Sequence, residues 1–262
     1  MEPLSLDLSH IGSPPFQDVY EPSEDTFLLA DAAQLVLQKL HQEKQQLNET
    51  PNQFHINVFV EVGCGSGMAL TTAAIVQSKL ENNQPIFAIA CDISHSACKA
   101  SQETIKRNLK NELVSLTPLR TNFLTLSACF PWLNYNASSS TSPLNGIDLL
   151  LFNPPYVPSP PSDRHLPMNA IWAGGENGRE VIDQFIPLIP KLLKPKGWCL
   201  LLVCKENNPE EIIKVLERYS LKSTVFFFFF PLFFFFFFFF FNFNFKTFLK
   251  KKKKKKKKKK DY

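Results

Sequence analysis

The amino-acid sequence predicts an α/β fold in which a central, mostly parallel sheet carries helices on both faces. Three observations support this prediction. A strand expected at 56–62 runs into a glycine-rich turn, a strand expected at 86–91 ends on Asp92, and an apolar run at 149–152 ends abruptly in a polar loop. Helical patterns lie between these strands. Loops at the carboxyl ends of parallel strands are where such proteins bind ligands.

The first helix is expected to begin after Ser23 and to continue to about Leu40. Ser23 and Thr26 have the spacing of a capping box. The acidic pair Glu24 and Asp25 falls in the first turn, where the helix dipole favours negative charge. The simplest interpretation of this stretch is a capped helix that lies over the sheet.

The glycine-rich turn is Glu61-Val62-Gly63-Cys64-Gly65-Ser66-Gly67, and a helix is expected to follow at 68–79. Glycines let the backbone turn tightly and let a ligand approach the main chain. The dinucleotide fingerprint requires a third glycine at position 68, which is methionine here. The pattern therefore favours S-adenosylmethionine, whose methionine part carries an ammonium group, and NAD stays open as the less favoured alternative.

Two further strand ends carry polar residues. Asp92 follows the second strand, where an acidic side chain can accept hydrogen bonds from ribose hydroxyls. The alternative role, capping the helix that begins near Ser94, is compatible with the first. Asn122 follows a third strand expected at 114–121, in a position to meet an adenine ring.

The apolar run at 149–152 delivers the loop Asn153-Pro154-Pro155-Tyr156. The prolines restrict the backbone, so Asn153 is held extended at the mouth of the strand. The side-chain carbonyl of Asn153 and the main-chain carbonyl of Pro154 are two acceptors that can grip a planar NH2 group, with the ring of Tyr156 packed against it. Such a loop is suited to alkylating an amide or an exocyclic amine. The alternative is a proline-rich loop that caps the strand and does no chemistry.

The rest of the chain continues the alternation of helices and strands. We expect a helix at 180–193, a fifth strand at 197–203, a helix at 209–219 and a sixth strand from Leu221. The serine-rich stretch 134–145 is expected to be a surface insertion, and 158–167 a proline-rich loop.

Charge and cysteine usage argue against several classes of function. Twelve lysines and one acidic residue lie in 226–262, so residues 1–225 hold 17 basic and 23 acidic side chains, a net charge of −6. This weakens the case for a nucleic-acid partner. The six cysteines form no Cys-x-x-Cys pair, no metal site is expected, and no secretory signal is visible. This favours a protein of the cytoplasm, with the nucleus as a second location.

Together these motifs resemble those of a known family. The chain is similar to the class I S-adenosylmethionine-dependent methyltransferases, whose fold is Rossmann-like. More narrowly it resembles the HemK-like release-factor glutamine methyltransferases, in the short eukaryotic form without the N-terminal helical domain. The resemblance rests on 20–29, 61–67, 149–157, and 172–180 with 205–211, and it covers most of residues 16–220.

The resemblance implies methyl transfer to the side-chain amide of the glutamine in the Gly-Gly-Gln motif of the eukaryotic peptide release factor. Eight positions would line the S-adenosylmethionine site: Thr26, Glu61, Gly63, Gly65, Asp92, Asn122, Phe123 and Asn153. The catalytic loop that holds the glutamine would be Asn153, Pro154, Pro155 and Tyr156. The family usually has aspartate at position 122, so Asn122 is expected to weaken cofactor binding at most.

The implied reaction is an in-line displacement at the sulfonium methyl, which depends on positioning and desolvation. No general base is needed if the proton leaves after methyl transfer. Relatives of this form are similar in needing a small zinc-binding activator subunit that pairs along the edge strand, here expected at 114–121.

The C-terminal stretch 226–262 consists mainly of phenylalanine and lysine runs. T-rich and A-rich nucleotide tracts encode such runs, so we interpret 1–225 as the methyltransferase domain and 226–262 as a low-complexity tail and a sequence artefact. The last antiparallel strand of the family would then be missing or replaced. The rival interpretation is a membrane tail anchor, because Val225–Phe241 is apolar, but its 17 residues are broken by Pro231.

Other substrates and roles stay open at the level of sequence. Adenine-amine DNA methyltransferases share the Asn-Pro-Pro-Tyr loop, although the acidic body argues against DNA. Protein lysine fits the loop less well, because it has no planar NH2 group. A pseudoenzyme or a tail-anchored scaffold is the alternative outside catalysis.

Overall fold

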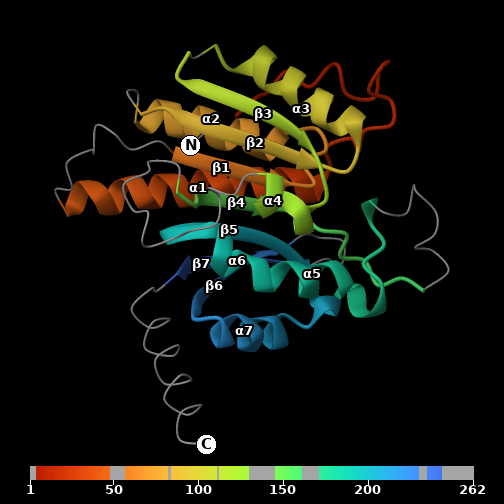
Figure 1. Cartoon of the computed structure of the whole chain (residues 1–262), viewed down its shortest axis with the longest axis vertical. Helices are drawn as coiled ribbons and strands as arrows, with labels where there is room; N and C mark the ends of the chain where they lie inside the picture. Colours follow the sequence, from red (N-terminus) through yellow and green to blue (C-terminus); the bar gives the residue numbers. More distant parts are fainter. Residues whose placement is uncertain are drawn as a thin grey trace, which may run out of the picture.

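The computed structural model describes residues 4–47, 57–81, 84–110, 112–129, 145–160, 171–229 and 235–243. These residues form one seven-stranded sheet with the order β3-β2-β1-β4-β5-β7-β6 and helices on both of its faces (Figure 1). The predicted α/β class and the mostly parallel sheet are therefore confirmed.

The five strands β1 to β5 are parallel, whereas β7 is antiparallel to both of its neighbours, β5 and β6. Their bounds are Asn57–Val62 (β1), Ile86–Asp92 (β2), Val114–Arg120 (β3), Ile147–Phe152 (β4), Leu193–Cys204 (β5), Leu221–Phe229 (β6) and Phe235–Phe243 (β7). The first four end at the residues where the sequence predicts the site. Parallel pairing thus brings their carboxyl ends to one edge of the sheet.

The longer helices alternate with the strands in sequence, as predicted. They are α1 (Glu24–Gln46), α2 (Met68–Leu80), α3 (His95–Asn108) and α7 (Pro209–Arg218), and α4 is a single turn at Leu126–Cys129. The helix expected at 180–193 is instead divided into α5 (Glu180–Phe185), a 3-10 turn and α6 (Ile189–Leu192). Pro187 and Pro190 lack the N–H that a continuous helix needs, which explains the division.

The hydrophobic core is divided between the two faces of the sheet. Phe59, Leu149 and Leu151 pack with residues of α1 and α2, while their neighbours along the strands, Leu150 and Phe152, pack with residues of α5 and α6. Successive side chains of a strand point to opposite faces, so a strand covered on both faces needs a continuous apolar run. Each such side chain contributes about 1.5–3 kcal/mol when it is fully buried.

The last antiparallel position of the sheet is filled. The expectation of a missing final strand is not met, because β7 pairs with β5 and β6, and the strand is built from the phenylalanine-rich segment. The sequence analysis also allows that the last strand is replaced by another segment, and this is the arrangement that the structure has. Strand β6 crosses position 225, so the sheet continues past the boundary that composition suggests.

Three sequence-based expectations lie wholly or mostly outside the described residues: the insertion at 134–145, the proline-rich loop at 158–167 and the lysine run near the C-terminus. Within the described part of the chain, no helix is long and apolar enough to span a membrane.

Candidate active site

A cavity of about 810 Å³ lies at the carboxyl ends of β1, β2, β3 and β4. Nine of the predicted site residues line it: Gly63, Gly65, Asp92, Asn122, Phe123, Asn153, Pro154, Pro155 and Tyr156. The other two, Thr26 and Glu61, are not part of its lining. Residues of the N-terminal segment, among them Tyr20 and Asp25, complete the wall.

The glycine-rich turn forms one side of the cavity. Gly63 and Gly65 have φ values of 62° and 46°, a conformation that residues with a Cβ rarely adopt. A Cβ at Gly65 would meet no heavy atom within 4 Å, so this position faces open space in which a ligand fits. Asp92 accepts hydrogen bonds from the Gly65 N–H (3.1 Å) and the Ser94 N–H (2.8 Å). It therefore braces the turn as well as lining the cavity, and burial raises the pKa of its carboxyl group.

Glu61 lies behind the turn. Its side chain is 4% exposed, and Oε2 accepts a hydrogen bond of 3.1 Å from the Leu70 N–H in the first turn of α2. Helix α2 begins after Gly67, which has no side chain that could cap it. Glu61 supplies this cap from the neighbouring strand. Burial, reinforced by the charge of Asp92, raises the pKa of Glu61 to about 8.

Another part of the cavity wall is formed after β3. Asn122 caps a short 3-10 turn, since its Oδ1 accepts a hydrogen bond of 3.0 Å from the Leu124 N–H. Phe123 packs against Phe152 and Phe185, with ring centroids 5.8 Å away in each case. The cap leaves the Asn122 Nδ2 group and a second lone pair of Oδ1 available to a ligand.

The loop after β4 brings Asn153 and Tyr156 to Asp25 of α1. Asn153 Nδ2 donates a hydrogen bond of 2.9 Å to Asp25 Oδ2, and the Tyr156 hydroxyl lies 3.3 Å from the same oxygen. Among the described residues, the buried Asn153 Oδ1 has no hydrogen-bond partner. The acceptor that the sequence predicts on Asn153 is therefore not used by the described part of the chain.

Sequence reasoning did not find Asp25, which we interpreted only as a residue favoured by the helix dipole. Its side chain is 7% exposed, and Oδ1 accepts hydrogen bonds from the Thr26 N–H (2.7 Å), the Ser23 hydroxyl (2.8 Å) and the Tyr20 hydroxyl (3.3 Å). Nothing local distinguishes Asp25 from its exposed neighbour Glu24. Its role depends on a contact 128 residues away.

The segment 172–180, further along the chain, packs against the Asn153–Tyr156 loop. The Val157 N–H donates to the Trp172 carbonyl (3.0 Å), and the Gly174 N–H donates to the Val157 carbonyl (2.8 Å). A Cβ at Gly174 would lie 2.5 Å from the Pro155 carbonyl oxygen, and one at Gly178 would overlap the carbonyl of Tyr156. The glycines of 172–180 therefore let this segment pack directly on the loop.

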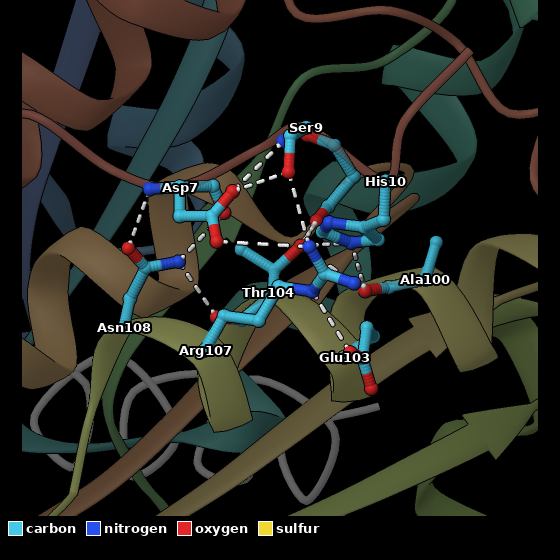
Figure 2. A network of polar contacts seen from close by, with 9 residues as sticks. Asp7, Ser9, His10, Ala100, Glu103, Thr104, Arg107 and Asn108 are labelled. Atoms are coloured by element: carbon cyan, nitrogen blue, oxygen red, sulfur yellow. Dashed lines mark hydrogen bonds and ion pairs between the residues drawn. The ribbon is translucent and has the colours of Figure 1, made fainter. Parts of the chain in front are cut away.

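The N-terminal segment is fastened to α3 by the polar network that Figure 2 shows. Asp7 and Asn108 exchange two hydrogen bonds, of 2.6 and 2.9 Å. His10 Nε2 lies 3.0 Å from Thr104 Oγ1, which donates to the Ser66 carbonyl (2.6 Å) of the glycine-rich turn. The network thus ties the segment that leads to Tyr20 and Asp25 to α3 and to the glycine-rich turn.

Comparison with known proteins places the chain in a family. No protein-family model matches it. It is 37% identical over 217 residues to the human protein "Methyltransferase HEMK2", and the match covers 82% of this chain and 85% of the relative. The chain belongs to the HEMK2 methyltransferase family. The HemK-like resemblance and the prediction of an enzyme are thereby confirmed, and the pseudoenzyme alternative loses its support.

A second relative agrees with this membership, and a solved structure agrees with the fold. The chain is 32% identical over 210 residues to the Schizosaccharomyces pombe protein "eRF1 methyltransferase catalytic subunit mtq2", with 78% of this chain and 80% of the relative covered. The METTL16 methyltransferase domain has a TM-score of 0.51 at 12% identity, with 90% and 94% of the two chains covered, and it shows the class I methyltransferase fold alone.

Proposed function

We propose that this HEMK2-family enzyme transfers the methyl group of S-adenosylmethionine to the side-chain amide nitrogen of the glutamine in the Gly-Gly-Gln motif of the eukaryotic peptide release factor eRF1. The observation that carries the proposal is the buried Asn153 Oδ1, which has no hydrogen-bond partner among the residues that the structure describes and lies in a loop that lines the cavity. The name of the fission-yeast relative, an eRF1 methyltransferase, supports this substrate.

The loop's role is to hold a planar NH2 group in one orientation. The Asn153 side-chain carbonyl and the Pro154 main-chain carbonyl accept its two hydrogens, which fixes the amide plane and leaves the nitrogen lone pair, perpendicular to that plane, free to meet the methyl group. Tyr156, next in the loop, limits the tilt of the group by packing of its ring. A neutral amide is a poor nucleophile, so this enforced geometry and the exclusion of water account for most of the rate enhancement.

The cofactor supplies an activated methyl group on a sulfonium centre. The cavity fits it, because it is large enough for a nucleoside and Gly65 leaves open space beside the turn. Asp92 would accept hydrogen bonds from the ribose hydroxyls, and Asn122 with Phe123 would hold the adenine. Thr26 and Glu61, which lie outside the cavity lining, would act through the backbone that they brace.

A second subunit is part of the proposal. The fission-yeast relative is named a catalytic subunit, which implies a partner in that protein. In this chain the edge strand β3 is half-buried along most of its length, with backbone groups on its outer side that an added strand can pair. We assign the partner to this edge and identify it as the small zinc-binding subunit that the family resemblance implies.

The proposal is tested by methyl transfer from labelled S-adenosylmethionine. The full chain, co-expressed with the activator subunit, is incubated in parallel with eRF1, with eRF1 in which the Gly-Gly-Gln glutamine is changed to alanine, and with duplex DNA. Label on wild-type eRF1 alone, mapped to the glutamine by mass spectrometry, is the expected result. Label on DNA alone, or on both eRF1 forms equally, would contradict the assigned substrate.

We also propose that 226–262 is a translated artefact, which its phenylalanine and lysine runs support. Amplification and sequencing of the 3′ end of the transcript test this. A stop codon or a splice junction upstream of the homopolymers is expected, whereas an open reading frame through both runs would refute it.

A further inference from the structure

We propose that Asp25 is a positioning residue, which fixes the Asn153 amide with its Oδ1 atom turned toward the substrate. This inference rests on the proposed function, since it concerns how the glutamine amide is gripped. It adds a residue that lies outside the Asn153–Tyr156 loop and 128 positions before it in the chain.

The argument begins with the chemistry of the contact. A carboxylate only accepts hydrogen bonds, whereas a side-chain amide has one accepting and one donating end. The Asn153 group that faces Asp25 Oδ2 at 2.9 Å must therefore be the NH2 group. Oδ1 then points away from Asp25, buried and without a partner among the described residues. An amide or hydroxyl at position 25 would not impose this choice, because each can donate as well as accept.

Asp25 is itself held so that it cannot turn away. Oδ1 accepts hydrogen bonds from the Thr26 N–H, the Ser23 hydroxyl and the Tyr20 hydroxyl, at 2.7, 2.8 and 3.3 Å. The side chain is 7% exposed and lies in the first turn of α1, where the helix dipole favours negative charge. With its other oxygen fully engaged, the carboxylate presents Oδ2 to the loop in one orientation.

The same oxygen reaches the second functional side chain of the loop. The Tyr156 hydroxyl lies 3.3 Å from Asp25 Oδ2. Burial, together with the neighbouring Asp25 charge, raises the pKa of Tyr156, so the hydroxyl keeps its proton and stays a donor. One carboxylate therefore orients both the acceptor that grips the NH2 group and the ring that packs against it.

A reciprocal exchange of the two side chains provides the test. In Asp25→Asn the side-chain oxygen keeps the three donors and an NH2 group faces position 153, so the Asn153 amide turns its Oδ1 toward position 25. The kcat is then expected to fall roughly 100-fold, as for a reacting group that is misplaced by about 1 Å. Asn153→Asp alone sets two carboxylates against each other, so its kcat should be lower still. In the double variant the amide donates from position 25, and the free oxygen of the carboxylate at 153 again faces the substrate. Its kcat should exceed that of Asn153→Asp by about tenfold or more.

The control is Glu24→Gln, which removes an exposed acidic residue from the same helical turn and should keep kcat within about twofold. Each variant is assayed on eRF1 with the activator subunit present, with kcat and KM determined separately and cofactor binding measured by calorimetry. A wild-type chain that does not label eRF1 would refute the proposed function and this inference with it. An active wild type together with an unimpaired Asp25→Asn variant, or a double variant no better than Asn153→Asp, would refute the inference alone.

Discussion

Asn207 Nδ2 donates a hydrogen bond of 2.8 Å to the main-chain carbonyl of Tyr156, 51 residues earlier in the chain. The same amide group donates to the Asn177 carbonyl (2.9 Å), and Asn207 Oδ1 accepts from the Cys204 N–H (2.8 Å). The side chain is fully buried. Asn207 therefore joins the end of β5, the glycine-rich segment 172–180 and the substrate loop at one point.

Replacement of this residue should loosen the substrate loop. Asn207→Ala removes the side chain that bonds two main-chain carbonyls and leaves the buried Cys204 N–H without its acceptor, which should lower the free energy of unfolding by about 2–4 kcal/mol. Urea denaturation measures the change. The control is Glu206→Ala, an exposed position in the same turn, where a change below about 0.5 kcal/mol is expected. Equal effects at the two positions would show that the hydrogen bonds of Asn207 contribute little.

The stability losses of Gly178→Ala and Gly65→Ala separate the effect of close packing from that of backbone strain. Both have positive φ, 67° and 46°, but only a Cβ at 178 would overlap a neighbouring main chain, that of Tyr156. Gly65→Ala should cost about 1 kcal/mol from conformation alone, whereas Gly178→Ala should cost at least about 3 kcal/mol. Thermal unfolding of the two variants checks the order, and equal losses would contradict the packing described for 172–180.

Because of Glu61, the free energy of unfolding should fall as pH rises. Its pKa is raised from 4.5 to about 8 in the folded chain, so between these values the folded state holds a proton that the unfolded state has lost. Stability then decreases with rising pH across this window. Glu61→Gln keeps an acceptor for the Leu70 N–H and removes the titration. From pH 5 to pH 8 the wild type should therefore lose unfolding free energy relative to the variant, by an amount on the order of 2–4 kcal/mol. The exposed Glu112→Gln serves as control, and a pH-independent difference for Glu61→Gln would show that Glu61 is not protonated in the fold.

Thr104 links the N-terminal segment to the glycine-rich turn. Thr104→Val keeps the shape of the side chain but removes the hydroxyl that bonds the Ser66 carbonyl and contacts His10. We expect a loss of about 1–3 kcal/mol in unfolding free energy, together with faster hydrogen exchange over residues 4–20. Hydrogen exchange followed by mass spectrometry measures this, and unchanged protection of that segment would mean that the network in Figure 2 does not hold it.

Local sequence patterns were sufficient for the elements and for part of the site. The strand ends at Asp92 and Asn153 were predictable because an apolar run followed by a polar residue marks the carboxyl end of a buried strand. The division of the helix at 180–193 was missed, although Pro187 and Pro190 are a visible signal. Asp25 and Asn207 could not be found in this way, since their contacts join residues 128 and 51 positions apart.

Composition alone does not predict that the phenylalanine-rich segment forms β7 and fills the last position of the sheet. Runs of one residue type carry no periodicity that distinguishes a paired strand from a tail. Pairing with β5 and β6 depends on neighbours that exist only once the sheet has formed.

The most direct test of the account is a crystal structure of the enzyme and its activator subunit with S-adenosylhomocysteine and a peptide that contains Gly-Gly-Gln. We predict that the glutamine side-chain nitrogen lies about 2.7–3.2 Å from both Asn153 Oδ1 and the Pro154 carbonyl oxygen, with Asn153 Nδ2 still bound to Asp25. A glutamine held elsewhere, or an Asn153 amide whose Oδ1 is turned toward Asp25, would contradict the account.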